Sequence, residues 1–158
     1  EINNFTEYKN YFYKTDHHWT LNGSYYAYLE YCRNLNIKAN NYALEIVNDE
    51  FYGTLYSKVL DNNLDTDYIY KIIDNTNYTY SFDDENYNSI YFEKYLKEKD
   101  KYLYYLGGNH GISKITNNEL VNGNNLLIIK DSYANSFIPF LTNNLYKSVK
   151  YLLTPQVK

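Results

Sequence analysis

The chain has 158 residues, which is the usual size of one domain and is enough to bury a sizeable hydrophobic core. Its formal net charge of −4 is spread without a long run of one sign, which argues against a nucleic-acid-binding protein. No apolar stretch approaches the ~20 residues of a membrane-spanning helix. Cys32 is the single cysteine, so the sequence excludes an intramolecular disulfide and a cysteine-based zinc site.

Tyrosine is unusually frequent, with 23 residues. Its side chain has an apolar ring and a polar tip, so it suits cores, hydrated interfaces and sugar-binding surfaces, although an AT-rich genome would produce the same surplus. The sequence begins at Glu1 and contains no methionine. We therefore expect a single domain over residues 1–158, excised from a longer protein, with any targeting or anchoring segment outside it.

The first half of the chain is predicted to mix helices and strands. A helix is expected over 22–35, because apolar side chains recur at steps of three and four residues and Thr20 or Asn22 can cap its start. A second helix is expected over 88–98. Runs of β-forming residues predict strands over 43–47, 54–60, 68–73, 78–82 and 112–116.

The last third of the chain contains the clearest unit. Residues 126–129 form a continuous apolar run, which is typical of a strand buried on both faces of a parallel sheet. Helical spacing over 133–142 and a strand over 147–153 complete a βαβ unit. Because ligand sites in open α/β sheets lie beyond the carboxyl ends of the strands, the segment 130–132 is predicted to contribute to a site.

Ser132 lies in that segment. A serine hydroxyl is a poor nucleophile until a base removes its proton. A turn between a buried strand and a helix would hold Ser132 exposed, and the N–H groups at the start of the helix would suit an oxyanion. The alternative is that Asp131 or Ser132 only caps the helix, a role that both residue types commonly have.

The segment 15–20 contains two adjacent histidines after an aspartate. Residues two apart in an extended segment share a face, so Asp16 can orient the imidazole of His18 while His17 points elsewhere. The His18 ring could then take the proton of a serine. Two alternatives stay open: Asp16, His17 and His18 could bind a metal, or the cluster could be structural, with Asp16 capping the next helix.

A glycine-rich segment over 107–111 surrounds Asn109 and His110. Glycines allow positive φ angles and a close approach of the backbone, so the amide of Asn109 could donate to an oxyanion. The alternative is an ordinary turn between two elements. His110 is a rival base, but His18 is the better candidate because a carboxylate lies two residues before it.

Four blocks of the sequence resemble the signature of the DHHW protein family. The first contains the specific Asp-His-His-Trp motif, and the matches follow in order from about Tyr11 to Leu141. The blocks are Tyr13–Thr20 with Gly23 and Tyr25–Tyr28, then Phe51–Ser57, Leu106–Gly111 and Leu127–Phe137.

The resemblance implies a relationship to the alginate O-acetyltransferase proteins of the SGNH-hydrolase-like group. It implies an α/β fold of three layers, SGNH-hydrolase-like (flavodoxin-like), with a mainly parallel central sheet. It also implies that the aspartate and histidine precede the serine in the chain, the reverse of the usual SGNH order. Family members are longer and have an N-terminal anchor, so this chain could lack early strands or an oxyanion donor.

The same resemblance implies a biological setting. Such relatives act outside the cell, often attached to the membrane, beside a membrane-bound O-acyltransferase that supplies acetyl groups. They place acetyl esters on exopolysaccharide. We therefore expect a monomer at the cell surface that uses no cofactor, with a polysaccharide as acceptor, an acetyl donor as second substrate and no nucleic-acid partner.

The expected activity is that of a serine-dependent O-acetyltransferase or acetylesterase. Ser132 would be the nucleophile, His18 the general base and then general acid, and Asp16 the residue that orients His18. The backbone N–H of Ser132 and the amide of Asn109 would hold the oxyanion.

Tyr133 and Trp19 would line the sugar site or, as the alternative, pack around the triad. A non-catalytic polysaccharide-binding or scaffold module of an acetylation complex is the competing function, and a metal-dependent hydrolase is a third. The decisive observation is the distance between His18 Nε2 and Ser132 Oγ, which must be near ~3 Å for proton transfer.

Overall fold

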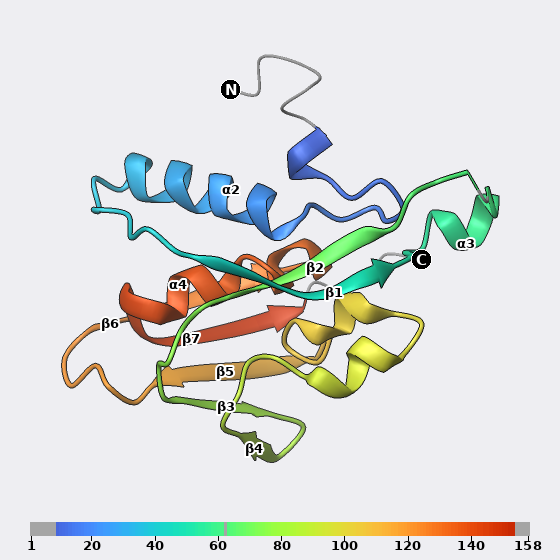
Figure 1. The fold of residues 1–158 in the computed structure, drawn as a ribbon. Helices are drawn as coiled ribbons and strands as arrows, with labels where there is room; N and C mark the ends of the chain where they lie inside the picture. Colours follow the sequence, from blue (N-terminus) through green and yellow to red (C-terminus); the bar gives the residue numbers. More distant parts are fainter. Residues whose placement is uncertain (1–8, 62, 154–158) are drawn as a thin grey trace.

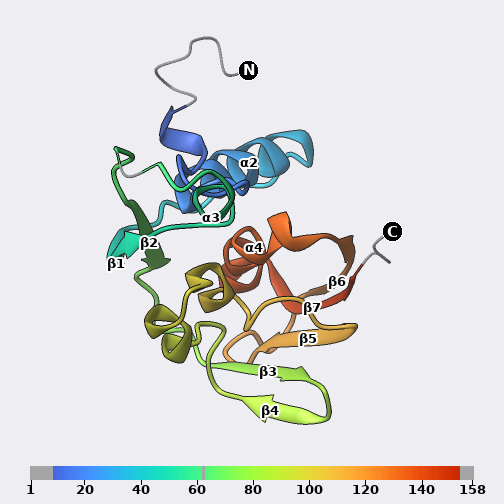
Figure 2. The same ribbon diagram turned by 90° about the vertical axis from the view of Figure 1, so that its right-hand side faces the viewer.

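The structure is a computed structural model that describes residues 9–61 and 63–153. Figure 1 shows helix α2 (Leu21–Asn34) on one side of the molecule and a five-stranded sheet on the other. Helix α4 (Ile138–Asn144) lies between them and packs on the sheet. A separate pair of antiparallel strands, β1 (Leu44–Phe51) and β2 (Asp67–Ile72), lies beside this stack (Figure 2).

The five-stranded sheet is mixed, with the order β4-β3-β5-β7-β6. Its strands are β3 (Tyr78–Phe82), β4 (Glu85–Tyr87), β5 (Ile112–Asn117), β6 (Asn124–Lys130) and β7 (Tyr146–Leu153). Within the described residues, β6 and β7 are the one parallel pair, and every other pair of neighbours is antiparallel.

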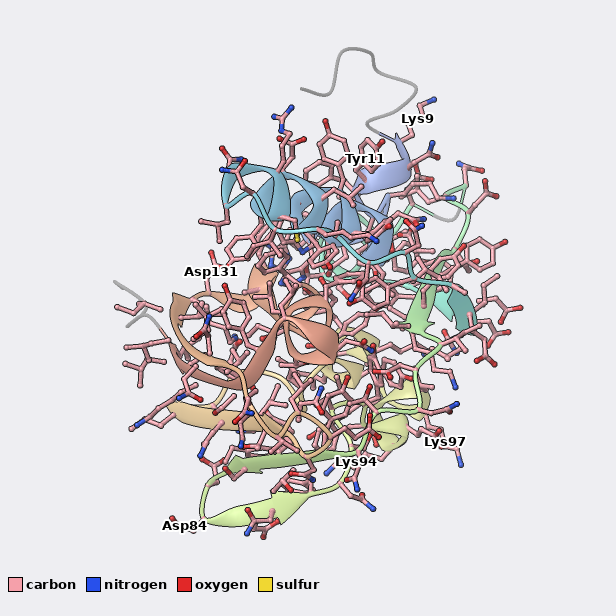
Figure 3. All side chains as sticks on the ribbon, turned by 90° about the vertical axis from the view of Figure 1, so that its left-hand side faces the viewer. Lys9, Tyr11, Asp84, Lys94, Lys97 and Asp131 are labelled. Atoms are coloured by element: carbon pink, nitrogen blue, oxygen red, sulfur yellow. The ribbon has the colours of Figure 1, made fainter. Side chains whose placement is uncertain are left out.

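The predicted three-layer, SGNH-hydrolase-like (flavodoxin-like) architecture with a mainly parallel central sheet is therefore wrong. A parallel pair needs a crossover of about a dozen residues or more, and the segment between β6 and β7 provides one. Strands β3 and β4 are instead joined by Asp83 and Asp84, both at positive φ, which is the conformation of a tight hairpin turn. Figure 3 shows Asp84 at the end of the molecule opposite to Lys9 and Tyr11.

Strand β6 also differs from the prediction of a strand buried on both faces. Leu127 is 60% exposed and Ile129 is 69% exposed, so the face of β6 that carries these two side chains meets solvent. The apolar run was correctly interpreted as a strand followed by a crossover. The prediction that both faces of this strand are buried is wrong, because an unbroken apolar run does not determine whether a second layer covers the strand.

Several local predictions are confirmed. The helix over 22–35 is α2, and the hydroxyl of Thr20 caps it by accepting from Gly23 N. The strands expected over 68–73, 78–82, 112–116 and 147–153 are β2, β3, β5 and β7, and the strand over 43–47 is the first part of β1.

Other local predictions are wrong. The segment 54–60, expected to be a strand, instead forms the short helix α3 (Tyr56–Val59). Thr15 O accepts hydrogen bonds from Leu55 N and Tyr56 N, and these bonds turn the chain at the start of α3. The helix expected over 88–98 is reduced to the 3₁₀ helix η1 (Glu93–Lys97), followed by η2 (Lys101–Tyr104), because a bridge between Tyr91 and Tyr105 holds residue 91 extended. The helix over 133–142 is divided into η3 (Ser132–Asn135) and α4.

Tyrosine rings fill much of the core, and several of their hydroxyl groups find partners there, although that of Tyr13 has none among the described residues. Tyr80 Oη donates to Leu106 O at 2.8 Å and lies 2.5 Å from Tyr151 Oη, and Tyr105 Oη donates to Tyr70 O at 2.7 Å. Buried polar groups without partners are costly, so this pairing allows tyrosine to replace purely apolar residues. The tyrosine surplus thus has a structural use.

Asp67 anchors the segment that contains the Asp-His-His-Trp motif. Its buried carboxylate accepts from Lys14 N at 3.1 Å, from Thr15 N at 2.7 Å and from Thr15 Oγ1 at 2.6 Å. A bridge between Phe12 and Trp19 closes the segment into a loop. Within the described ranges, no helix is long and apolar enough to cross a bilayer.

We predict that Asp67→Ala lowers the free energy of unfolding by about 3 kcal/mol, because two buried donors of Thr15 and the part-buried Lys14 N lose a charged acceptor. The matched control is Asp65→Ala, since the Asp65 side chain is 93% exposed and should contribute less than about 0.5 kcal/mol. Urea unfolding followed by circular dichroism measures both. Equal stability of the two variants would contradict the anchoring role of Asp67.

Candidate active site

A chain of hydrogen bonds joins three of the residues predicted from the sequence. His18 Nε2 lies 2.8 Å from Ser132 Oγ, and His18 Nδ1 lies 2.5 Å from Asp16 Oδ1. Asp16 and His18 are buried, while Ser132 is half-buried and so reachable from solvent. The distance named as decisive therefore lies within the range for proton transfer. Because Asp16 accepts at Nδ1, the arrangement favours a His18 tautomer whose Nε2 can accept the serine proton.

The carboxylate of Asp16 is held from two sides. Oδ1 also accepts from His18 N at 3.0 Å, and Oδ2 accepts from Thr54 N at 2.8 Å and Thr54 Oγ1 at 3.0 Å. Burial acts to raise the pKa of Asp16, but the hydrogen bonds from His18 and Thr54 outweigh it and bring the pKa well below its ordinary value. Asp16 therefore stays ionised beside His18 at neutral pH.

Gly53 and Thr54 were not identified as functional from the sequence. A Cβ atom at Gly53 would lie 2.2 Å from the Cβ of Asp16, so a larger residue would push the carboxylate away. The signal that could have found them is the block Phe51–Ser57, which matched the family signature without an assigned role.

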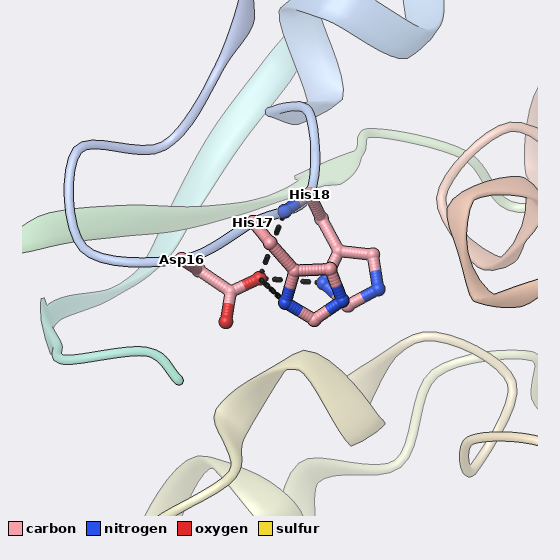
Figure 4. Close-up of side chains that lie close together, drawn as sticks. All are labelled: Asp16, His17 and His18. Atoms are coloured by element: carbon pink, nitrogen blue, oxygen red, sulfur yellow. Dashed lines mark hydrogen bonds and ion pairs between the residues drawn. The ribbon is translucent and has the colours of Figure 1, made fainter. Parts of the chain in front are cut away.

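His17 does not join the chain to Ser132. Its Nδ1 lies 2.7 Å from Thr54 Oγ1, and its ring is inclined by 38° to that of His18, with 3.9 Å between centroids. Figure 4 shows the rings of His17 and His18 beside the Asp16 carboxylate. Possible ligand atoms of Asp16, His17 and His18 lie within 4.8 Å of one another, and Asp16 Oδ1 and His18 Nδ1 are already joined by a hydrogen bond.

Tyr102 forms the other face of the His18 pocket, and sequence reasoning missed it. Its ring is parallel to the imidazole to within 8°, with 3.8 Å between centroids. Its hydroxyl donates to Ser132 O at 3.1 Å and lies 3.2 Å from Ser136 Oγ. Burial raises the pKa of Tyr102, so it remains a neutral donor. Tyr102 thus contacts both the imidazole and the serine backbone.

Trp19 and Tyr133 pack around the serine turn. Trp19 Nε1 donates to Tyr133 O at 2.8 Å and to Ser136 Oγ at 2.9 Å, and the Tyr133 hydroxyl donates to the carbonyl of His17. Both residues also line a hollow of about 380 Å³ that reaches the exposed edge of β6. Trp19 and Tyr133 therefore pack around the serine turn and also face a surface hollow, so the structure is compatible with both of the roles that the sequence left open.

Asp131, labelled in Figure 3, caps the turn. Its carboxylate accepts from Tyr133 N at 3.0 Å, so the capping role considered for either Asp131 or Ser132 belongs to Asp131. The hydroxyl of Ser132 is therefore available to His18.

Lys130 links the serine turn to the glycine-rich segment. Its buried ammonium donates to Asn109 Oδ1 at 3.3 Å, to Asp131 O at 3.2 Å and to Asn135 Oδ1 at 2.5 Å. Asn135 Nδ2 also donates to Asn109 Oδ1, at 3.2 Å. Burial lowers the pKa of Lys130 to about 8, although nearby Asp131 acts against this. Because Lys130 Nζ and Asn135 Nδ2 both donate to Asn109 Oδ1, the NH₂ group of Asn109 faces away from Lys130.

His110, the rival base, lies elsewhere. Its Nδ1 is 3.0 Å from Asp83 Oδ2, and its ring stacks on Phe82 with 3.6 Å between centroids. These contacts direct it to the β3–β4 turn and away from Ser132.

Solved structures and a family profile resemble this chain, whereas no curated protein matches it. A DHHW family protein from Eubacterium siraeum is similar in structure, with a TM-score of 0.75 and 27% identity over 93% of this chain and 52% of that chain. Bacillus cereus PatB1 has a TM-score of 0.70 and 19% identity, over 96% of this chain and 56% of PatB1. A second PatB1 structure, with a sulfonyl adduct, has a TM-score of 0.69 and 20% identity over 93% and 53%.

The chain therefore spans about half the length of these solved proteins. The sequence profile of the family described as "DHHW protein" matches residues 3–151, nearly the whole chain. This chain belongs to the DHHW family.

Proposed function

We propose that this protein is a serine-dependent O-acetyltransferase that esterifies a polysaccharide outside the cell, or an acetylesterase that acts through the same acetyl-enzyme. The observation that carries the proposal is the continuous hydrogen-bond chain from Asp16 through His18 to Ser132, with distances of 2.5 and 2.8 Å. That order of carboxylate, imidazole and hydroxyl is the arrangement that activates a serine.

In the first step, Ser132 Oγ attacks the carbonyl carbon of the acetyl donor and its proton passes to His18 Nε2. The bond to the leaving group breaks, and the leaving group takes the proton from His18. In the second step, a sugar hydroxyl attacks the acetyl-serine ester while His18 accepts its proton and returns it to Ser132 Oγ. Asp16 remains ionised and stabilises the imidazolium in both steps.

The backbone N–H of Ser132 and the amide of Asn109 are the proposed oxyanion donors. Lys130 and Asn135 both donate to Asn109 Oδ1, which supports a fixed orientation of that amide. Preorganised donors stabilise the developing charge because they need not reorient during the reaction.

Two further observations support the assignment. One PatB1 structure carries a sulfonyl adduct, and sulfonyl reagents modify activated nucleophiles. The resemblance to alginate O-acetyltransferase proteins supports an acetyl donor supplied by a membrane-bound O-acyltransferase, a polysaccharide acceptor and a location at the cell surface. The 2.8 Å separation of His18 and Ser132 argues against a non-catalytic scaffold.

We expect Ser132→Ala and His18→Ala each to lower the rate of p-nitrophenyl acetate hydrolysis by about 10³-fold or more, since each removes a member of the chain. Absorbance of released nitrophenolate measures the rate. His110→Ala is the matched control, because His110 pairs with Asp83, and it should retain activity. Full activity of Ser132→Ala would refute the mechanism. Activity lost on adding a chelator would favour the metal alternative.

Gly53→Ala should lower kcat/KM by about 10²-fold, because the new Cβ displaces the carboxylate that orients His18. Gly111→Ala is the control, since nothing lies within 4 Å of a Cβ at that position. Circular dichroism checks that both variants fold. A folded Gly53→Ala protein with wild-type activity would be inconsistent with a role for Gly53 in seating Asp16.

The pH profile tests Lys130. The pKa of Lys130 is about 8, so its ammonium loses a proton, and with it one of three donated hydrogen bonds, as the pH rises through that value. Wild-type kcat/KM should therefore decline there. Lys130→Met should be slower at neutral pH and lack this decline, while Lys150→Met, at an exposed position, should keep the wild-type profile. An identical decline in Lys130→Met would assign the titration to another group.

A further inference from the structure

A groove lies beside the Asp16 end of the site. It consists of two adjoining hollows of about 230 and 350 Å³, both lined by Tyr52, Ser57 and Lys99. Gly53 and Thr54, which contact the carboxylate of Asp16, form part of its wall. The groove therefore continues directly from the residues that position His18.

Two tyrosines lie in this groove. The rings of Tyr52 and Tyr56 are 4.3 Å apart between centroids and inclined by 36°, and Tyr52 is 38% exposed. This differs from the core, where tyrosine rings are enclosed by other side chains. An exposed aromatic surface with hydroxyl groups at its rim suits the apolar face and polar edge of a sugar ring.

The groove is also richer in positive charge than the chain as a whole, whose net charge is −4. Lys58, Lys99 and Lys101 line it, against the carboxylates of Glu50 and Asp100. Within the part of the chain that the structure describes, none of these lysines forms an ion pair with a carboxylate. Lys101 Nζ donates to Glu98 O at 3.2 Å, a neutral acceptor, so no described carboxylate compensates the charge of any of the three lysines.

We propose that this groove binds the acceptor and selects a polysaccharide that carries carboxylate groups. The inference rests on the proposed function, which supplies a reason for a sugar chain to lie beside Ser132. One sugar unit would stack on Tyr52 with its carboxylate near Lys99. The groove lies on the Asp16 side of the imidazole and Ser132 lies on the other side, so a unit further along the sugar chain would present its hydroxyl to the acetyl-enzyme. Charge attraction would favour acidic over neutral chains and would weaken with salt.

Binding of two sugar hexamers to the Ser132→Ala protein tests the groove separately from catalysis. Isothermal titration calorimetry would compare a hexamer of galacturonate with an uncharged hexamer of glucose. We expect the galacturonate hexamer to bind about tenfold more tightly, with an affinity that falls as salt is raised. Equal affinities that do not change with salt would overturn the charge selection.

Variants in the same Ser132→Ala background locate the binding. Tyr52→Ala should weaken both hexamers about tenfold, and the double change Lys99→Gln with Lys101→Gln should weaken only the galacturonate hexamer. Tyr68→Ala is the control, because Tyr68 is 46% exposed on β2 and lies outside the groove. If the groove variants and the control bind alike, the groove is not the acceptor site. Absence of esterase activity in the wild type would instead reject the proposed function.

Discussion

The carboxylate of Asp16 is the centre on which the rest of the site depends. It accepts hydrogen bonds from two donors of His18 and two donors of Thr54, and these bonds overcome the effect of burial on its pKa. Three distant parts of the chain meet around this carboxylate and its histidine. Asp67 fixes the loop that contains Asp16, Gly53 leaves room for its carboxylate, and β6 brings Ser132 to the opposite side of the imidazole.

The imidazole itself is held by aromatic packing. Tyr102 stacks on one face of the His18 ring, while His17 and Tyr133 contact it from other directions. Such packing restricts the ring to the orientation in which both of its nitrogens have partners. The abundance of tyrosine in this chain therefore contributes to the core, to the pocket around His18 and to the exposed surface beside the site.

The sequence indicated the residues whose role depends on local spacing. Asp16 and His18 are two positions apart, and Ser132 follows an apolar strand, but these patterns alone left a cap or a structural pair as alternatives. The resemblance to the DHHW family joined the three residues into one predicted site. Gly53, Tyr102 and Lys130 could not be anticipated, because their roles arise only when separate segments pack together. Strand direction failed for a related reason: an apolar run predicts a strand, but the partner and its orientation depend on turns such as Asp83-Asp84.

The central claim is that Ser132 forms a covalent acetyl intermediate with His18 as its base. The most direct measurement is mass spectrometry of the protein quenched during turnover of p-nitrophenyl acetate. The account predicts one added acetyl group on the peptide that contains Ser132, and none there in His18→Ala. Turnover without acetylation of Ser132, or with acetylation at another residue required for turnover, would contradict it.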